Sequence, residues 1–432
     1  QSIGNPLMEV GDCITIDDEN KDVIEVSDKV WIESVDSKWD NKLALDNYET
    51  TSYAPWESFM PKMPVNENNF KDADGNNNDI DASSSQPMVN VRNGSAASPF
   101  EIGNAYQLDD VRSYLGEYKH FIQTADIDLG VDGWSDGEGW QPLGDSTTKF
   151  SGSFDGDGYE ISNLTINRPT TSYQGLFGSI DNAEISNITL VNASVQGGQH
   201  TGALAGGADN SYIADIHIAT GQIKGGQYTG GLMGSMSNSD IYSSSFNGMV
   251  KGTGKNGGLA GSISRSSIYY SYSLGSVEGT DEVGGLVGYH HRSMITDSYS
   301  RSSVSGGSRV GGLVGYSSGS SSARTYIYNS YSSGEVTGTG SYVGGLVGEG
   351  GSYSYSYAVD SYWDTESSGS TWSPVGTGKT TAEMKQQEIF SGWNFNTLWL
   401  INEGNDYPVF QNLSVYGKPS TVELADLDGD GS

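Results

Sequence analysis

The sequence predicts an all-β protein, a right-handed parallel β-helix with a triangular coil of about 27 residues and short capping helices. Three observations predict it. A Gly-Leu signature, in most repeats Gly-Gly-Leu-x-Gly, recurs along the chain. Apolar residues divide most repeats into three parts of about nine residues each. Ser, Thr, Tyr, Val and Gly dominate the repeats. That composition is typical of strands and turns rather than of helices. The signature leucines are Leu176, Leu204, Leu232, Leu259, Leu286, Leu313 and Leu346.

Two further apolar positions mark each repeat. The second lies nine residues after the leucine, at Ile185, Ile213, Ile241, Ile268 and Ile295. The third is Val195, Ile223, Val250, Val277 and Val304, and the next leucine follows nine residues later. Three equal sides predict a triangular coil that pairs with its neighbours about 4.8 Å away, with leucine stacked on leucine. The right-handed path follows the general handedness of parallel crossovers.

Both ends of the repeat array are expected to be covered, because open end coils would invite edge-to-edge growth. The helix-spaced Leu108, Val111 and Leu115 predict an N-terminal capping helix over 106–115. The segment 380–413, with Trp393 and Trp399, is expected to cover the other end. Thr380 and Glu383 form a capping box, which predicts a helix near 381–390.

A column of tyrosines is expected on the outside of the coils, at Tyr272, Tyr299, Tyr331 and Tyr362. Two interpretations remain open: the rings stack on one another and stabilise the solenoid, or they bind sugar rings.

Charge excludes several classes of protein. The chain has 22 Lys and Arg against 54 Asp and Glu, a net charge of −32, which disfavours binding to nucleic acid or to anionic membranes. No apolar run is long enough to cross a bilayer, so no transmembrane segment is expected. The single Cys13 cannot form an internal disulfide. Because the chain begins at Gln1, we expect a mature or trimmed secreted chain, although a recombinant fragment would look the same.

The acidity divides the chain into regions. Residues 1–90 hold 19 acids and 6 bases, a net charge of −13, whereas 176–357 hold 11 acids and 8 bases, a net charge of −3. We expect an acidic segment or small β module with a linker at 1–93 and the solenoid with its N-terminal cap at 94–379. A capping segment at 380–417 and the start of a calcium-binding-like tail at 418–432 follow.

The repeats and their flanks resemble the GLUG-motif proteins over about 94–413. The motifs that carry this resemblance, besides the Gly-Leu signature, are Gly94-Ser-Ala-Ala-Ser-Pro-Phe-Glu-Ile102, Ala125-Asp-Ile-Asp-Leu129, Phe154-Asp-Gly-Asp-Gly158 and Ser361-Tyr-Trp-Asp-Thr365. The resemblance implies a solenoid in a secreted or surface protein, often an adhesin-like one. No catalytic residue belongs to the GLUG motif, so the resemblance implies none.

Two acidic clusters suggest calcium as a cofactor. Asp426, Asp428 and Asp430, followed by Gly431, have the spacing that opens an EF-hand-type loop, and they resemble the start of a dockerin. The later acidic ligand is absent before Ser432. A looser version of the pattern consists of Asp72, Asp74 and Asn76. In so acidic a chain, the alternative interpretation of both clusters is solvated loops.

A partner-binding corner is expected where two late coils are longer than the others. The insertions, Tyr316–Tyr326 and Glu349–Tyr357, should form adjacent loops, since both fall at the same corner. The candidate partner-binding residues are His290, His291, Arg292, Tyr316, Arg324, Tyr353 and Tyr355, with Arg265 one coil earlier. The alternatives are drift in loop length, a solvated structural corner, or a catalytic or ligand-binding cleft.

Catalytic motifs are weak. A G-x-S-x-G match at 315–319 and a G-x-G-x-x-G match at 252–257 lie within repeats and fit chance in a chain with 60 Gly. We therefore expect a non-catalytic extracellular surface protein, not an enzyme: an adhesin, a surface-layer protein or a filament subunit. Its partners would be other surface-protein subunits or extracellular glycans, and self-association is a further option. The alternative is a β-helix protein that binds or degrades polysaccharide, as a lyase or a glycoside hydrolase.

Overall fold

The computed structural model describes residues 93–131 and 133–411, together with five short strands nearer the N-terminus. The chain forms two compact units, Gln1–Val91 and Arg92–Ser432. In the first unit β3 pairs antiparallel with β1 and β4, and β2 pairs antiparallel with β5. These strands are β1 (Met8–Glu9), β2 (Asp22–Ile24), β3 (Lys29–Ile32), β4 (Leu43–Ala44) and β5 (Tyr53–Pro55).

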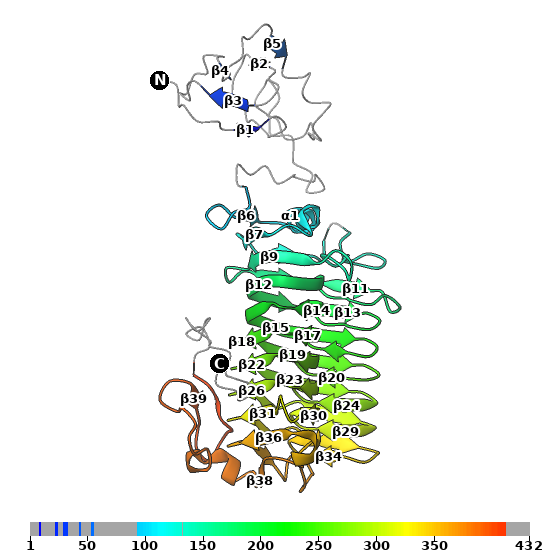
Figure 1. The fold of residues 1–432 in the computed structure, drawn as a ribbon, viewed down its shortest axis with the longest axis vertical. Helices are drawn as coiled ribbons and strands as arrows, with labels where there is room; N and C mark the ends of the chain where they lie inside the picture. The colour runs from blue at the N-terminus through cyan, green and yellow to red at the C-terminus, as the bar shows by residue number, and fades with distance from the viewer. Residues whose placement is uncertain are drawn as a thin grey trace. The chain divides into compact units, whose positions relative to one another are not determined.

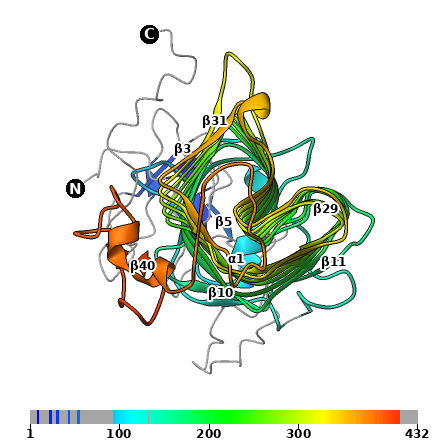
Figure 2. The ribbon, with the colours of Figure 1, turned by 90° about the horizontal axis from the view of Figure 1, so that it is seen from below.

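The second unit is a parallel β-solenoid, which confirms the predicted fold class (Figure 1). A typical coil runs through β21 (Ala260–Ser264), β22 (Ser267–Tyr269) and β23 (Tyr272–Glu278). Each of these strands pairs in parallel with its equivalent one coil later. A short fourth strand, β24 (Asp281–Gly284), closes the coil and belongs to a separate five-stranded sheet. The view along the axis shows the coils superposed, with this fourth strand in a lobe beside the main ring (Figure 2).

The remaining strands repeat this plan around the coils. The first coils contain β6 (Phe100–Ile102), β7 (Lys119–Gln123), β8 (Ile127–Asp128), β9 (Phe150–Asp155), β10 (Glu160–Ser162), β11 (Thr165–Asn167), β12 (Phe177–Val191) and β13 (Ala193–Gln196). The middle coils contain β14 (Ala205–Asp209), β15 (Tyr212–Lys224), β16 (Thr229–Gly230), β17 (Met233–Ser237), β18 (Asp240–Tyr242), β19 (Ser245–Lys251), β20 (Asn256–Gly257), β25 (Val287–His291), β26 (Met294–Thr296), β27 (Tyr299–Ser300), β28 (Ser303–Gly306) and β29 (Ser308–Gly311). The last coils contain β30 (Val314–Ser318), β31 (Thr325–Tyr328), β32 (Tyr331–Ser332), β33 (Val336–Gly338), β34 (Val343–Gly344), β35 (Val347–Glu349), β36 (Ser356–Val359), β37 (Tyr362–Asp364) and β38 (Thr377–Lys379).

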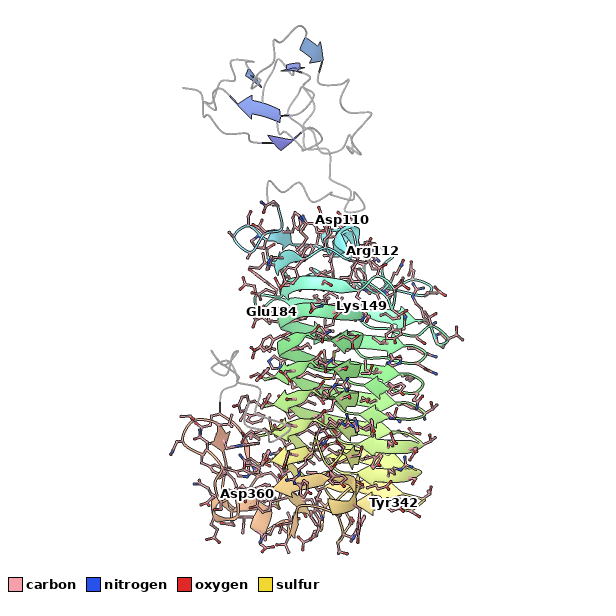
Figure 3. All side chains as sticks on the ribbon, viewed as in Figure 1. Asp110, Arg112, Lys149, Glu184, Tyr342 and Asp360 are labelled. Carbon is pink, nitrogen blue, oxygen red and sulfur yellow. The ribbon has the colours of Figure 1, made fainter. Side chains whose placement is uncertain are left out.

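The predicted apolar columns form the core. All seven signature leucines are fully buried, and the backbone N–H of Leu259 donates to the carbonyl oxygen of Leu286 at 2.9 Å. The isoleucine column pairs in register, as at Ile241 and Ile268, and so does the valine column. Side chains on the outside project from every coil, with Lys149 on the first coils and Tyr342 on the last (Figure 3).

The signature glycines let successive coils approach closely. A Cβ on Gly258 would collide with the carbonyl oxygen of Gly285, the equivalent residue of the next coil. The same collision would occur between Gly285 and Gly312. A side chain at this position would therefore force the stacked backbones apart, which explains why the repeat keeps glycine there.

Two serine columns flank the buried isoleucines. In the first, the backbone N–H of Ser239 donates to the Oγ of Ser266, and that hydroxyl donates to the carbonyl oxygen of Ser264. The second column behaves in the same way, as at Ser244 and Ser271. Each hydroxyl thus satisfies a buried backbone donor where the strands turn the corner. The columns are Ser211, Ser239, Ser266, Ser293 and Thr325, and Ser244, Ser271, Ser298, Ser330 and Ser361.

The N-terminal end carries the predicted helical cap. Helix α1 (Ala105–Asp110) continues into the 3₁₀ turn η4 (Val111–Tyr114), and Leu108 and Val111 are fully buried. The Asn104 side chain caps the helix by accepting from the backbone N–H of Gln107. Seen along the axis, α1 lies within the outline of the ring, so it covers the interior of the first coils (Figures 1 and 2).

The segment 380–411 does not cover the end of the solenoid as the sequence predicted. It packs against the side of the last coils. The end itself is covered by 365–379: Gly345 donates its backbone N–H to the carbonyl oxygen of Trp372, and β38 pairs with β37. The side segment contains η6 (Glu383–Lys385), η7 (Gln387–Ile389), β39 (Trp399–Leu400) and β40 (Val409–Phe410). We call 380–411 the C-terminal strap.

The capping box that opens the strap forms, but no α-helix follows it. The backbone N–H of Thr380 donates to the Glu383 carboxylate at 2.8 Å, and the Glu383 N–H donates to the Thr380 hydroxyl at 3.2 Å. Gln386 then adopts an extended conformation (φ −121°, ψ 128°), which separates η6 from η7. The expected helix at 381–390 is therefore two 3₁₀ turns.

Candidate functional site

The tyrosine column is covered by the C-terminal strap. Tyr272, Tyr299 and Tyr331 stack at centroid distances of 4.9 and 5.0 Å. The Trp399 and Phe410 rings lie against this stack, and the Tyr331 hydroxyl donates to the carbonyl oxygen of Pro408 at 2.6 Å. Since Tyr331 is fully buried, this part of the column cannot meet a sugar ring from solvent. Of the two interpretations, the structure supports the stabilising one.

Polar contacts fasten the strap to the coils. The Arg301 guanidinium donates to the Tyr331 hydroxyl at 2.8 Å and to the carbonyl oxygen of Tyr407 at 3.0 Å. The Asp364 carboxylate accepts from the hydroxyls of Tyr407 and Thr381 at 2.6 and 2.7 Å. Burial alone would raise the pKa of Asp364, but these hydrogen bonds outweigh burial and the pKa is lowered. This face is therefore a structural contact within the chain.

The two inserted loops lie together at one corner, as expected from their position in the repeat. We call residues 319–324 and 350–355 the loop corner; it includes the 3₁₀ turn η5 (Ser352–Ser354). The N–H of Gly319 donates to the carbonyl oxygen of Ser354 at 2.6 Å, and the N–H of Thr325 donates to the carbonyl oxygen of Tyr355 at 3.0 Å. Tyr353 is fully exposed and Tyr355 is 38% exposed. The corner protrudes beside β31 in the axial view (Figure 2).

The prediction that His290 contacts a partner is wrong. Strand β25 alternates, so His291 faces outward and His290 faces the core, where it is fully buried. Its Nδ1 lies 3.3 Å from the Ser317 hydroxyl of the next coil. Burial lowers the pKa of His290 to about 3, so the ring is neutral at physiological pH. In register, His290 occupies the inward column that holds Ile263 one coil earlier.

Tyr316 lies on strand β30 beside a network of ion pairs. Its ring centroid is 5.2 Å from the Arg309 guanidinium carbon, and Arg309 pairs with Glu282 and Glu349 at 2.7 Å each. Lys255 pairs with Glu282 at 3.4 Å. Sequence reasoning missed this network, although Lys255, Glu282 and Arg309 recur at 27-residue intervals, the period of the coil.

Three arginines occupy the same corner of three successive coils. We call Arg265, Arg292 and Arg324 the arginine column. Backbone hydrogen bonds join Arg265 and Arg292 to the next coil. The N–H of Arg265 donates to the carbonyl oxygen of His291 at 3.1 Å, and the N–H of Arg292 donates to the carbonyl oxygen of Ser318 at 3.0 Å. Arg265 and Arg324 are exposed, and Arg292 is half-buried. Within 93–131 and 133–411 none of the three forms an ion pair with a carboxylate.

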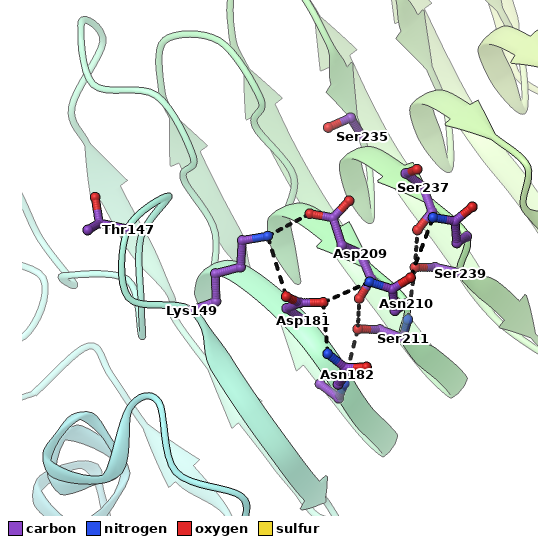
Figure 4. A network of polar contacts seen from close by, with 12 residues as sticks. Thr147, Lys149, Asp181, Asn182, Asp209, Asn210, Ser211, Ser235, Ser237 and Ser239 are labelled. Atoms are coloured by element: carbon purple, nitrogen blue, oxygen red, sulfur yellow. Dashed lines mark hydrogen bonds and ion pairs between the residues drawn. The ribbon is translucent and has the colours of Figure 1, made fainter.

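The earlier coils carry neutral side chains or paired charges at this edge. Lys149 pairs with Asp209 at 2.7 Å and with Asp181 at 3.7 Å (Figure 4). The Asn210 amide donates to Asp181 at 3.0 Å, and the Asn238 amide donates in turn to Asn210 at 3.4 Å. The edge therefore changes from satisfied asparagines to arginines along the solenoid.

A shallow hollow of about 610 Å³ extends across several coils next to the fourth strands. Turns from different coils line it, with Ser172, Gln199, Gln227, Thr253 and Asp281 among the lining residues. The lining is mostly hydroxyl, amide and backbone, so it suits hydrogen bonding to a neutral polar ligand. This hollow is a second candidate site, which the sequence did not indicate.

The predicted calcium ligands Asp426, Asp428, Asp430, Asp72, Asp74 and Asn76 lie outside the described residues, so calcium remains a prediction. In the part of the chain that the structure describes, no three His, Cys, Asp or Glu side chains form a group that could hold a metal ion. Among the same residues, no helix is long and apolar enough to span a membrane.

Comparisons of the sequence give short matches to surface-type proteins. No protein-family model matches the chain, so GLUG membership remains a resemblance. The chain is 40% identical over 125 residues to Halomucin of Haloquadratum walsbyi, and 43% identical over 98 residues to a "Putative Gly-rich membrane protein" of Evansella cellulosilytica. These matches span 27% and 22% of this chain, but only 1% and 11% of the two relatives.

Comparison of the structure gives a protein of the same fold and corrects one expectation. A Bacteroides ovatus chain described as a "putative immunoglobulin A1 protease" matches with a TM-score of 0.50 and 23% identity, covering 74% of this chain and 94% of that one. The prediction that this protein is not an enzyme is contradicted, because a chain of the same fold is described as a protease. At this identity the likeness concerns the fold alone, so the correction assigns no reaction.

Proposed function

We propose that the solenoid belongs to a secreted or cell-surface protein and presents the loop corner to an extracellular partner. The observation that carries the proposal is the position of the two insertions: they lie in successive coils, hydrogen bond to each other and leave Tyr353 fully exposed. The names of the two sequence relatives, a halomucin and a membrane protein, and the net charge of −32 support an extracellular setting.

The composition of the loop corner suits a contact surface. Its serines and glycines offer adaptable hydrogen bonds, while Tyr353 and Tyr355 add large, rigid contact area at low entropic cost. Arg324 lies at the same corner, with its guanidinium carbon 5.6 Å from the centroid of the Tyr357 ring. The regular coils act as a rigid support for this corner. An adhesin, a surface-layer protein and a filament subunit would each use a support of this kind.

The first experiment tests location and contact separately. Antibody against the solenoid should label intact cells of the native organism as strongly as lysed cells. A variant with both loops shortened to the nine-residue spacing should keep its thermal midpoint but lose cell adhesion or self-association. The matched control shortens neither loop and replaces Ser320 and Ser322, both in the first loop, by Gly. Unchanged adhesion and self-association by the shortened variant would assign the insertions to drift.

A second candidate function, polysaccharide binding or degradation, is favoured by the hollow of about 610 Å³ with its hydroxyl and amide lining. A panel of extracellular glycans assayed both for binding and for product release separates it from protein–protein contact. Substitution of Gln199 and Gln227 by Ala should weaken binding if the hollow is the site. Binding that is insensitive to these changes would exclude it.

A further inference from the structure

The arginine column stands apart from the other arginines of residues 93–411. Arg112, Arg168, Arg301 and Arg309 each pair with a carboxylate. The three arginines of the column do not, although the chain carries 54 acidic residues against 22 basic ones. Like charges repeated at about 4.8 Å, the distance between coils, repel one another unless an anion lies between them. The column is thus a concentrated positive site on an acidic protein.

Among the described residues no carboxylate forms an ion pair with the column, and the Nε of Arg265 donates to the amide oxygen of Asn238 at 2.9 Å. The outward residues beside it are Ser264, His291 and Ser318, which pair in register. The pKa of His291 is lowered first by burial and then by the positive charges of Arg292, Arg265 and Lys255. Arg324 hydrogen bonds with the Tyr326 side chain. The Nε of Arg292 has no hydrogen-bond partner in the described part of the chain.

The backbone at this corner does not favour arginine. Arg265 and Arg292 adopt φ values of +48° and +50°, as do the equivalent Asn182, Asn210 and Asn238 in earlier coils, at +51°, +49° and +47°. Asparagine enters this left-handed region more readily than arginine does. The change from Asn to Arg therefore works against backbone preference.

We propose that the arginine column, with the tyrosines of the loop corner, binds an acidic polysaccharide that carries one carboxylate per sugar residue and lies along the solenoid axis. The proposal rests on the extracellular role argued above. One coil advances about 4.8 Å, so the column presents a regular row of positive charge along the solenoid axis, which is complementary to a chain of closely spaced carboxylates.

The chemistry of the column fits that ligand. A guanidinium forms paired, charge-assisted hydrogen bonds with a carboxylate, and this geometry distinguishes arginine from lysine. Tyr355 lies at the same corner one coil after Arg324, because the Thr325 N–H donates a hydrogen bond to the carbonyl oxygen of Tyr355. The partly exposed Tyr355 ring offers a surface on which a sugar can pack. The exposed Tyr353 extends that surface within the same loop.

The experiment measures binding of alginate, a polyuronate, to the full chain in a chelating buffer, so that calcium does not bridge the polymer. The test variant combines Arg265→Asn, Arg292→Asn and Arg324→Ser; asparagine is the residue of the earlier coils at the first two positions. The control combines Lys224→Gln, Lys251→Gln and Lys379→Gln, which changes the net charge equally but lies elsewhere. We expect about tenfold or greater weakening for the test variant and about twofold or less for the control. Binding of the native chain should weaken with added salt.

Several results would overturn the proposal: no binding of alginate, equal binding of neutral dextran, or equal losses in the test and control variants. Binding of poly-L-glutamate as tight as that of alginate would replace the polysaccharide by an acidic peptide. A thermal midpoint that matches the native chain confirms that the arginine variant folds; if it does not fold, Arg265→Asn alone provides the test. Intact-cell labelling and loop shortening use no alginate, so failure of the proposed function is detected independently.

Discussion

The backbone N–H of Ser239 donates a hydrogen bond of 3.1 Å to the hydroxyl of Ser266, its equivalent in the next coil. Ser266 donates that hydroxyl onward to the carbonyl oxygen of Ser264 at 2.9 Å. Both serines are buried, so the hydroxyl replaces the water that a corner amide would otherwise need. The serines of this repeat are therefore part of the stacking between coils as well as of its polar surface.

Replacing Ser266 by Ala should destabilise the solenoid, because the N–H of Ser239 would lose its buried acceptor. We expect a loss of about 1–3 kcal/mol in the free energy of unfolding, measured by urea titration. Ser194→Ala in β13 is the control, since Ser194 is exposed, and its effect should stay within about 0.5 kcal/mol. Equal losses in both variants would show that the buried hydrogen bond is not the cause.

Replacing Leu286 by Ala should cost about 2–5 kcal/mol of unfolding free energy, because it opens a cavity in a column whose neighbours, Leu259 and Leu313, are held by backbone hydrogen bonds. Leu286→Met, which roughly keeps the volume, should cost less than about 1.5 kcal/mol. Urea titration of both variants provides the measurement. Similar small losses would mean that the leucine column is not packed as described.

Replacing Trp399 by Ala should loosen the C-terminal strap, since this fully buried ring packs on the tyrosine column. We expect a lower thermal midpoint, a loss of about 3–5 kcal/mol, and self-association through the uncovered Tyr299 and Tyr331. Size-exclusion chromatography with light scattering detects the second effect. Trp372→Ala is the control, because Trp372 is 48% exposed. A monomeric and equally stable Trp399 variant would contradict the role of the strap as a cover.

The apolar columns could be predicted from the sequence, whereas the inward position of His290 could not be predicted from the charged cluster in which it stands. The period of the leucines determines which coil residues stack, and the structure follows that period without a slip from Leu176 to Leu313. His290 was misplaced because three polar residues in a row suggest a surface. In the coils before His290, the equivalent residues two positions after the last signature glycine, including Met236 and Ile263, are apolar and buried, and that alternation was the missing signal.

The side position of the strap had no signal of its own in the sequence. Trp393 and Trp399 indicate that the segment packs on something, but aromatic residues do not reveal which surface receives them. The tyrosine column was the other half of the contact, and its period pointed only to an exposed row. To predict that the strap packs on the tyrosine column, one would have had to know which strap atom accepts a hydrogen bond from each buried tyrosine hydroxyl. For Tyr331 that acceptor is the carbonyl oxygen of Pro408.

The last prediction concerns the effect of acid on the strap, where the buried Asp364 and the half-buried Asp297 respond to pH with opposite signs. The pKa of Asp364 is lowered in the folded chain, since hydrogen bonds from Tyr407, Thr381 and the backbone outweigh the effect of burial. Its contribution to stability is therefore present above the ordinary value of 3.8 and is lost as the pH falls through the folded pKa. The pKa of Asp297 is raised, chiefly by burial. Its charge therefore opposes folding at neutral pH, and protonation relieves that cost as the pH falls through its folded pKa.

We therefore expect Asp364→Asn to lower the free energy of unfolding at pH 7 by about 1–3 kcal/mol and to weaken its dependence on pH below 4. Asp297→Asn is the matched control: it keeps an acceptor for the Trp399 Nε1–H and removes a half-buried charge, so it should be neutral or stabilising at pH 7. Urea titrations at pH 7 and pH 3, followed by tryptophan fluorescence, measure both. A stabilising Asp364→Asn, or a strongly destabilising Asp297→Asn, would reverse the assigned signs and with them the account of how the strap is held.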